Sequence, residues 1–168
     1  KNFKEEIMWK HLKYLFISFI IILIQTELIP LISLKGINPD LLTIWIVYIA
    51  LQKGQMQSTI WGFIIGLLFD FIVGTFIGLS ALSKTITGFF AGYFYSENKA
   101  QMILGSYRFI IIILITSFIH NTVYFVAFTF GTEISITKAI FQIGLTTSFY
   151  TAAIALLPMF FFYRKSLF

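Results

Sequence analysis

The chain has 168 residues, of which 58% are hydrophobic and only 11% are charged, and its net charge is +5. A soluble domain has about 25% charged residues, so this composition excludes soluble, disordered, coiled-coil and nucleic-acid-binding proteins and indicates an integral membrane protein. The absence of cysteine excludes disulfides, thiolate catalysis and cysteine-based metal sites. A bilayer core takes about 20 helical residues per crossing, so the length allows about six crossings.

Apolar segments follow one another with short connections, and we expect a single domain over residues 1–168. The predicted fold is an all-α integral membrane protein, a bundle of six transmembrane helices. The expected spans are about 12–32, 39–53, 57–74, 76–95, 107–130 and 136–162. The second span is short, roughly 22 Å at 1.5 Å per residue, so it must tilt little or lie where neighbours cover its ends.

Two short motifs mark changes of direction in the chain. Asn38-Pro39-Asp40 predicts a helix start, with Asn38 as the N-cap, Pro39 in the first helical position and Asp40 in the first turn. Gly74 and Gly78 interrupt an apolar stretch that is too long for one crossing. They therefore predict the turn between the third and fourth spans.

The distribution of lysine and arginine predicts the orientation of the bundle. With six spans, both termini share one side of the membrane, and nine of the twelve cationic residues fall on that side. Only Lys35 and Lys138 fall on the opposite side, and Lys84 lies inside a span. Because cytoplasmic loops carry the excess of positive charge, we expect both termini to be cytoplasmic.

Three residues are clear cases of a charged side chain inside the predicted spans: Glu27, Asp70 and Lys84. A charge in hydrocarbon costs about 2.5–3.5 kcal/mol even on insertion scales, so such residues usually face the protein interior and find a partner. In a hairpin centred near Phe76, Asp70 stands close in level to Lys84, which predicts a buried ion pair. The pair could fix the helix register or form a proton or ligand site; alternatively, Lys84 points outward and Asp70 caps a helix or faces water.

Glycine spacing supports the same hairpin. The third span carries Gly62 and Gly66, and the fourth carries Gly88 and Gly92. Glycines four residues apart let helix backbones approach closely. We therefore expect these four residues to pack the third span against the fourth.

The fifth span is interrupted by the polar residues His120, Asn121 and Thr122. Interhelical hydrogen bonds explain such a cluster, and contact with a substrate or partner is the alternative. We expect no metal site and no cofactor.

No motif of a known enzyme class is present, and the loops are too short for a catalytic domain. The one set that could be drawn as an intramembrane hydrolase site consists of Asp70, Ser80, Ser83 and Lys84. The simpler interpretation is that these residues support the helix packing. We therefore expect no enzymatic activity.

The motifs from Asn38 to Gly92 have the order and spacing of a known family. They are Asn38-Pro39-Asp40-Leu41-Leu42, the run from Gly62 to Asp70, Gly74, and Gly78-Leu79-Ser80-Ala81-Leu82. This stretch resembles the rod shape-determining protein MreD family, and the chain length and hydropathy agree with that resemblance.

The resemblance implies a multi-pass protein of the bacterial inner membrane. It would be a non-enzymatic scaffold subunit of the cell-elongation complex (the elongasome), which controls peptidoglycan synthesis and cell shape. The implied partner is an MreC-like bitopic membrane protein, with indirect links to MreB filaments and to the synthase formed by RodA and a class B penicillin-binding protein. Membrane lipids are further partners, and nucleic acid is not.

The family fold also implies an alternative function. It is thought to resemble the substrate-binding component of energy-coupling-factor transporters. A small-molecule-binding or lipid-binding membrane subunit with an outward-facing polar pocket therefore stays open beside the scaffold.

Overall fold

The computed structural model describes residues 3–34, 36–74, 76–129 and 136–166, and it is all-helical apart from one isolated two-residue bridge. Lys1, Lys35 and residue 130, which entered the expected charge count or spans, lie outside these ranges. The elements are α1 (Phe3–Leu23), a π-helical turn η1 (Ile24–Leu28), a 3-10 turn η2 (Ile29–Ile32), α2 (Leu41–Lys53), α3 (Gln55–Val73), α4 (Leu79–Gly92), α5 (Ala100–Leu104), α6 (Tyr107–Thr129), α7 (Ile136–Lys138), a π-helical turn η3 (Ala139–Gly144), α8 (Leu145–Ile154) and α9 (Leu156–Ser166).

Four helical segments of the described chain are long and apolar enough to cross a membrane: Met8–Ile32, Gln55–Val73, Tyr107–Thr129 and Ile136–Arg164. Six such spans were expected. The two expected spans that fall short are α2, with 13 residues, and α4, with 14. At 1.5 Å per residue these helices extend only about 20 Å, which is less than a bilayer core of about 30 Å.

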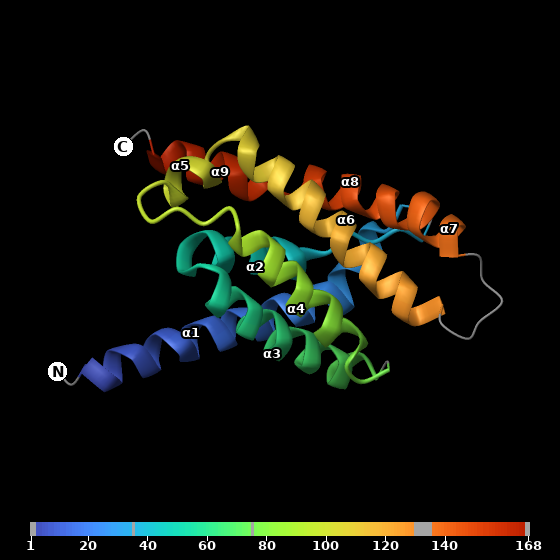
Figure 1. The fold of residues 1–168 in the computed structure, drawn as a ribbon, viewed down its shortest axis with the longest axis horizontal. Helices are drawn as coiled ribbons and strands as arrows, with labels where there is room; N and C mark the ends of the chain where they lie inside the picture. The colour runs from blue at the N-terminus through green and yellow to red at the C-terminus, as the bar shows by residue number, and fades with distance from the viewer. Residues whose placement is uncertain (1–2, 35, 75, 130–135, 167–168) are drawn as a thin grey trace.

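The short helix α2 lies inside the bundle, where other helices surround it (Figure 1). Its residues Leu42, Ile46, Val47, Ile49 and Leu51 are fully buried. A helix that is apolar on all sides is expected in the core of a protein or in a membrane. Here neighbouring helices cover it. This is one of the two arrangements expected for so short a span, the other being a span with little tilt.

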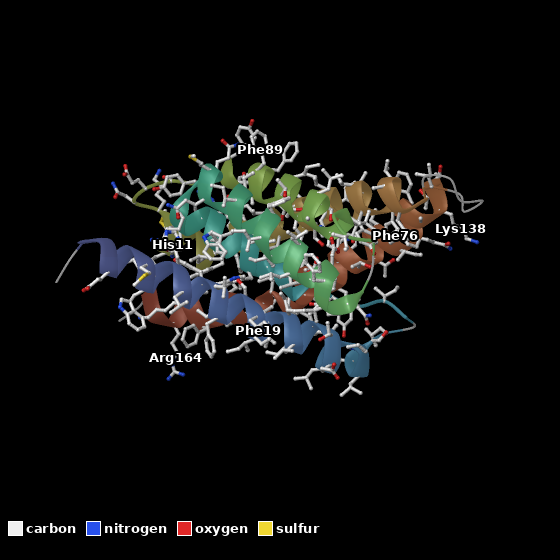
Figure 2. The ribbon with its side chains drawn as sticks, turned by 90° about the horizontal axis from the view of Figure 1, so that it is seen from below. His11, Phe19, Phe76, Phe89, Lys138 and Arg164 are labelled. Carbon is white, nitrogen blue, oxygen red and sulfur yellow. The ribbon has the colours of Figure 1, made fainter. Side chains whose placement is uncertain are left out.

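Both termini lie at the same end of the bundle (Figure 1). His11 and Arg164 lie at that end, whereas Phe76 and Lys138 lie at the opposite end (Figure 2). We refer to these as the terminal end and the loop end.

Helices α3 and α4 form a tightly packed hairpin with glycine at each close approach. A Cβ atom added at Gly66 would lie 2.5 Å from the Ser80 carbonyl oxygen, and one at Gly62, Gly88 or Gly92 would overlap the backbone of the facing helix. Hydrogen bonds cross the same seam, because Ser58 Oγ donates to the Gly88 carbonyl at 2.8 Å. Small residues and polar cross-links of this kind hold helices together where hydrophobic force between them is weak.

The turn between these helices uses glycine for its backbone conformation. Gly74 ends α3 with a φ of 72°, and Gly78 precedes α4 with a φ of 99°. Both values lie in the left-handed region, which side chains with a Cβ rarely adopt. The expected turn glycines therefore occupy the positions where the chain reverses.

The rest of the chain departs from the predicted spans in two places. The polar connection after α4 contains a short helix, α5 (Ala100–Leu104), that was not expected. The last expected span is divided into α7, η3, α8 and α9, and η3 is a π-helical turn. Such turns insert an extra residue into a helix and are frequent at functional sites.

We expect Gly88→Ala to destabilise the protein by about 1–3 kcal/mol, the usual cost of overpacking, although alanine is the better helix former. The added Cβ would overlap the Ser58 carbonyl group, which cannot move without shifting α3. Gly144→Ala is the control, because its nearest neighbour is the Asn121 side chain at 3.2 Å. Thermal unfolding in detergent measures the effect of both substitutions. An unfolding temperature that Gly88→Ala leaves unchanged would contradict the close packing of α3 against α4.

Candidate functional site

The structure concentrates its buried charge around Asp40, at the start of α2. The Asp40 carboxylate caps this helix, because Thr43 N–H donates to Oδ1 at 3.1 Å and Thr43 Oγ1 donates to Oδ2 at 2.7 Å. The helix therefore begins at Leu41, two residues later than expected, and Asp40 rather than Asn38 is the N-cap. The reason is that a carboxylate three residues before Thr43 satisfies both its N–H and its hydroxyl group.

Lys84 of α4 binds the same carboxylate. Its Nζ lies 2.7 Å from Asp40 Oδ2, and only 2% of the lysine is exposed. The Nζ also lies 5.9 Å from the centre of the Phe69 ring, close enough for a cation–π contact. The expected pairing of Lys84 with Asp70 is thus corrected: the lysine is buried and paired, and its partner is Asp40.

The register of the hairpin explains the change of partner. The Lys84 carbonyl group faces Gly62, and the Ser80 carbonyl group faces Gly66. Gly62 lies eight residues before Asp70 on α3, so the backbone of Lys84 is roughly 12 Å deeper than that of Asp70. The prediction had placed the two nearly level, because it took the turn to be symmetrical about Phe76.

Asp70 instead caps α4, one of the alternatives that the sequence left open. Its carboxylate accepts hydrogen bonds from the backbone N–H groups of Gly78 at 2.9 Å, Ser80 at 3.1 Å and Ala81 at 3.3 Å. Carboxylates are favourable at helix N-termini, where N–H groups lack helical partners. These bonds draw the start of α4 back alongside the end of α3, which sets the observed register.

Two further helices reach Asp40. His120 of α6 places Nε2 3.2 Å from Asp40 Oδ2, and Thr151 of α8 accepts a hydrogen bond from the Asp40 backbone N–H at 3.0 Å. We call Asp40, Thr43, Lys84, His120 and Thr151 the polar centre. Residues up to 111 positions apart in the sequence therefore meet at one carboxylate and its own backbone.

Gln25 of η1 holds the chain just before α2. Its side-chain amide donates to the Pro39 carbonyl at 2.9 Å and accepts from the Leu41 N–H at 2.9 Å. This pair of bonds brackets Asp40 and fixes the backbone that presents it. Sequence reasoning missed Gln25, Thr43 and Thr151; the spacing of Asp40 and Thr43 was the one available signal.

Asn121 makes the interhelical hydrogen bonds expected of this polar cluster. Its Nδ2 donates to the Gly144 carbonyl at 3.0 Å and to Ser148 Oγ at 3.1 Å. These bonds join α6 to η3 and α8. The neighbouring Thr122 hydroxyl donates to its own helix at the Phe118 carbonyl.

Glu27 differs from the other two intramembrane ionisable residues because it is exposed. It lies on η1, where the Ile29 N–H donates to the Ile24 carbonyl, five residues earlier, and where none of the residues is buried. Pro30 follows, and it has no N–H with which to continue the regular pattern. The expectation that Glu27 faces the interior is therefore corrected.

A cavity of about 420 Å³ adjoins the polar centre. Its lining includes Asp40, Lys84, His120, Asn121 and Tyr124. A volume of this size falls in the range of small-molecule sites. The wall combines polar and aromatic groups.

The arrangement does not favour hydrolysis. Ser83 Oγ donates to the Leu79 and Ser80 carbonyl groups of its own helix, and Lys84 is held by Asp40. Nucleophilic catalysis requires a base within reach of the hydroxyl group. Within the described ranges, no group of three or more histidine and acidic side chains is placed to hold a metal ion.

A protein-family model for the rod shape-determining protein MreD matches residues 8–166. The chain belongs to the MreD family. Family membership, together with the candidate membrane spans, makes it a multi-pass membrane protein with a role in determining rod shape, in a family not known for enzymes. Comparison with curated proteins and with solved structures gave no match.

We expect this MreD-family protein to lose stability when either member of its buried pair is changed. Leaving one buried charge unpaired costs about 3–5 kcal/mol, so Asp40→Asn and Lys84→Met should each unfold at much lower temperature. The double variant should recover part of the loss. Thermal unfolding in detergent provides the double-mutant cycle.

A second double-mutant cycle, which combines Asp70→Asn with Lys84→Met, is the control. It tests whether Asp40 or Asp70 is the partner of Lys84. We expect it to give a clearly smaller coupling energy, because Asp70 accepts from backbone N–H groups. A larger coupling for Asp70 than for Asp40 would contradict the observed pairing.

Proposed function

We propose that the chain is a non-enzymatic scaffold subunit of the bacterial cell-elongation complex in the inner membrane. It docks an MreC-like bitopic protein and so helps couple MreB filaments to the RodA and class B penicillin-binding protein synthase. The observation that carries this proposal is the family match over residues 8–166. The polar centre supports it, because charges held by protein groups stabilise a helix arrangement rather than react.

The proposed topology has six crossings with both termini cytoplasmic. Two of these crossings are the short helices α2 and α4. Location of both termini at one end supports an even number of crossings (Figure 1). The excess of lysine and arginine at the terminal end supports the orientation.

The face around Glu27 is the proposed docking position for the partner's transmembrane helix. An exposed carboxylate in an apolar segment is unfavourable in lipid, so a partner with a hydrogen-bond donor would stabilise it. Leu28 and Leu31 beside it are 54% and 80% exposed. Polar groups and close packing drive helix association in membranes.

The topology is tested with single cysteines, which are unambiguous in a chain that has none. A membrane-impermeant thiol reagent applied to intact cells should label Ser33→Cys and leave Ser96→Cys unlabelled, because the first lies at the loop end and the second at the terminal end. Permeabilised cells provide the control for reactivity. The reverse pattern would overturn the orientation.

A photoreactive residue at Leu31 should cross-link to the helix of an MreC-like protein in cells, and Glu27→Leu should reduce that yield several-fold. Phe89 is the control position, since it lies on the opposite side of the bundle from Phe19 of α1 (Figure 2). Cross-linking at Phe89 but not at Leu31 would refute the docking face.

The cavity of about 420 Å³ favours a second candidate function, that of a small-molecule-binding subunit. Gly36 and Asn38, in the connection before α2, also line it. Under this alternative, the purified chain retains a small ligand that denaturation releases for mass spectrometry. If the chain retains a ligand and no position cross-links to a bitopic helix, the small-molecule-binding function is favoured over the scaffold function.

A further inference from the structure

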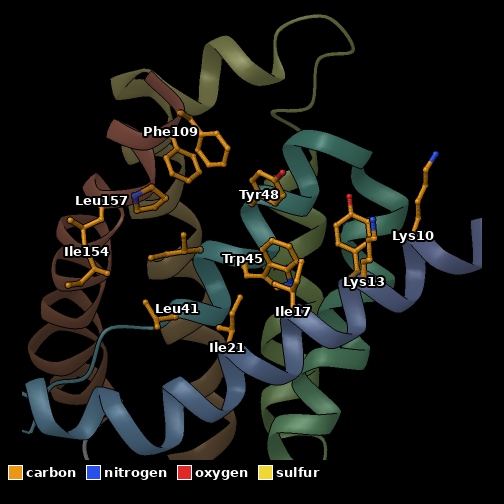
Figure 3. Close-up of a pocket in the computed structure, with 14 residues that line it drawn as sticks. Lys10, Lys13, Ile17, Ile21, Leu41, Trp45, Tyr48, Phe109, Ile154 and Leu157 are labelled. Carbon is orange, nitrogen blue, oxygen red and sulfur yellow. The ribbon is translucent and has the colours of Figure 1, made fainter. Parts of the chain in front are cut away.

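A second, larger cavity runs along α2 from Leu41 to Tyr48 and reaches Lys10 and Lys13 of α1. It is a groove of about 650 Å³ between α1, α2 and the α8–α9 segment (Figure 3). Trp45 and Tyr48 of α2 lie on its floor, and Ile17 of α1 faces Leu157 of α9 across it. Apart from two lysines, the side chains that line it are aliphatic or aromatic.

The groove exists because α1 is held to the bundle along one side. Trp45 Nε1 donates to Ser18 Oγ at 2.9 Å, and Tyr14 packs on Trp45 with ring centres 5.8 Å apart. His11 stacks on Trp61 of α3 at 6.0 Å. These contacts bind α1 to α2 and α3 and leave its other side separated from α9.

The two lysines stand at the mouth of the groove. Lys10 and Lys13 are one helical turn apart on α1, so they share a face. Both are exposed, and Figure 3 shows them on α1, on the opposite side of the groove from Ile154 and Leu157. A positive mouth above an apolar groove complements an amphipathic molecule with an anionic head.

We propose that this groove binds an anionic phospholipid, with an acyl chain along Trp45 and Leu157 and the phosphate between Lys10 and Lys13. Basic pockets between transmembrane helices are known to bind such headgroups. The chemistry of the lining favours a lipid, because Lys10 and Lys13 at the mouth complement a phosphate and the apolar side chains below them complement an acyl chain. The phosphate would sit in the leaflet at the terminal end.

This inference goes beyond the scaffold function and does not depend on it. The proposed partner face at Glu27 and the lipid groove lie toward opposite ends of α1 and its continuation. Failure of partner cross-linking leaves the lipid site unaffected, and failure of lipid binding leaves the docking face unaffected.

The test uses the full chain, purified in mild detergent and stripped of lipid, with phosphatidylglycerol and phosphatidylcholine as probes in native mass spectrometry. We expect one tightly bound phosphatidylglycerol per chain and a preference over phosphatidylcholine on the order of ten-fold. Lys10→Gln with Lys13→Gln should abolish the preference and leave phosphatidylcholine binding unchanged. Lys53→Gln with Lys99→Gln is the matched control, since it removes the same charge from two other exposed lysines.

Leu157→Trp tests the groove itself. It should reduce binding of both lipids, whereas Leu156→Trp, beside it but outside the lining, should not. Circular dichroism and monodisperse elution verify folding, and the lysine variants decide the question if Leu157→Trp fails to fold. Absence of a headgroup preference, or an equal loss in the Lys53 and Lys99 control, would overturn the proposal; so would a photoreactive residue at Leu157 that cross-links to a protein instead of lipid.

Discussion

The buried contact between the Asp40 carboxylate and the Lys84 ammonium group constrains the rest of the structure. Both groups lose most of their hydration, a cost that mutual attraction offsets only when further hydrogen bonds satisfy the remaining atoms. Thr43 and His120 provide those contacts to the carboxylate, and Asp40 also binds Thr151 through its backbone. The requirement for these contacts brings α2, α4, α6 and α8 to one point.

This meeting point accounts for the two short helices. Because Asp40 is both the cap of α2 and the partner of Lys84, α2 must begin at the polar centre, inside the bundle. Leu34 and Ile37 in the chain that leads to it are bridged by two backbone hydrogen bonds, and Gln25 pairs with backbone groups on either side of Asp40. Helix α4 packs directly on α2, which brings Lys84 to Asp40, and the glycine seam packs α3 against α4.

The sequence predicted the helical class, the segment order and the burial of Lys84, because composition and the cost of a charge in lipid determine these features. It did not predict the partner of Lys84. That choice depends on the register of α3 and α4, which Asp70 sets by binding N–H groups across a turn whose shape residue counting does not reveal. Glu27 shows a second limit: the cost of a charge in lipid predicted that it faces the interior, but it lies on a π-helical turn in which no residue is buried.

The two ends of the molecule differ in chemistry, and α1 connects them. At the loop end, its continuation is fixed by Gln25 to the backbone beside the polar centre. At the terminal end, α1 is held only on the side of Trp45 and Trp61, and the groove separates it from α9. The proposed acyl chain would fill the space between α1 and α9 in this groove. The proposed partner face at Glu27 belongs to the other attachment, so α1 and its continuation carry two separate proposed contacts, one with a lipid and one with a partner helix.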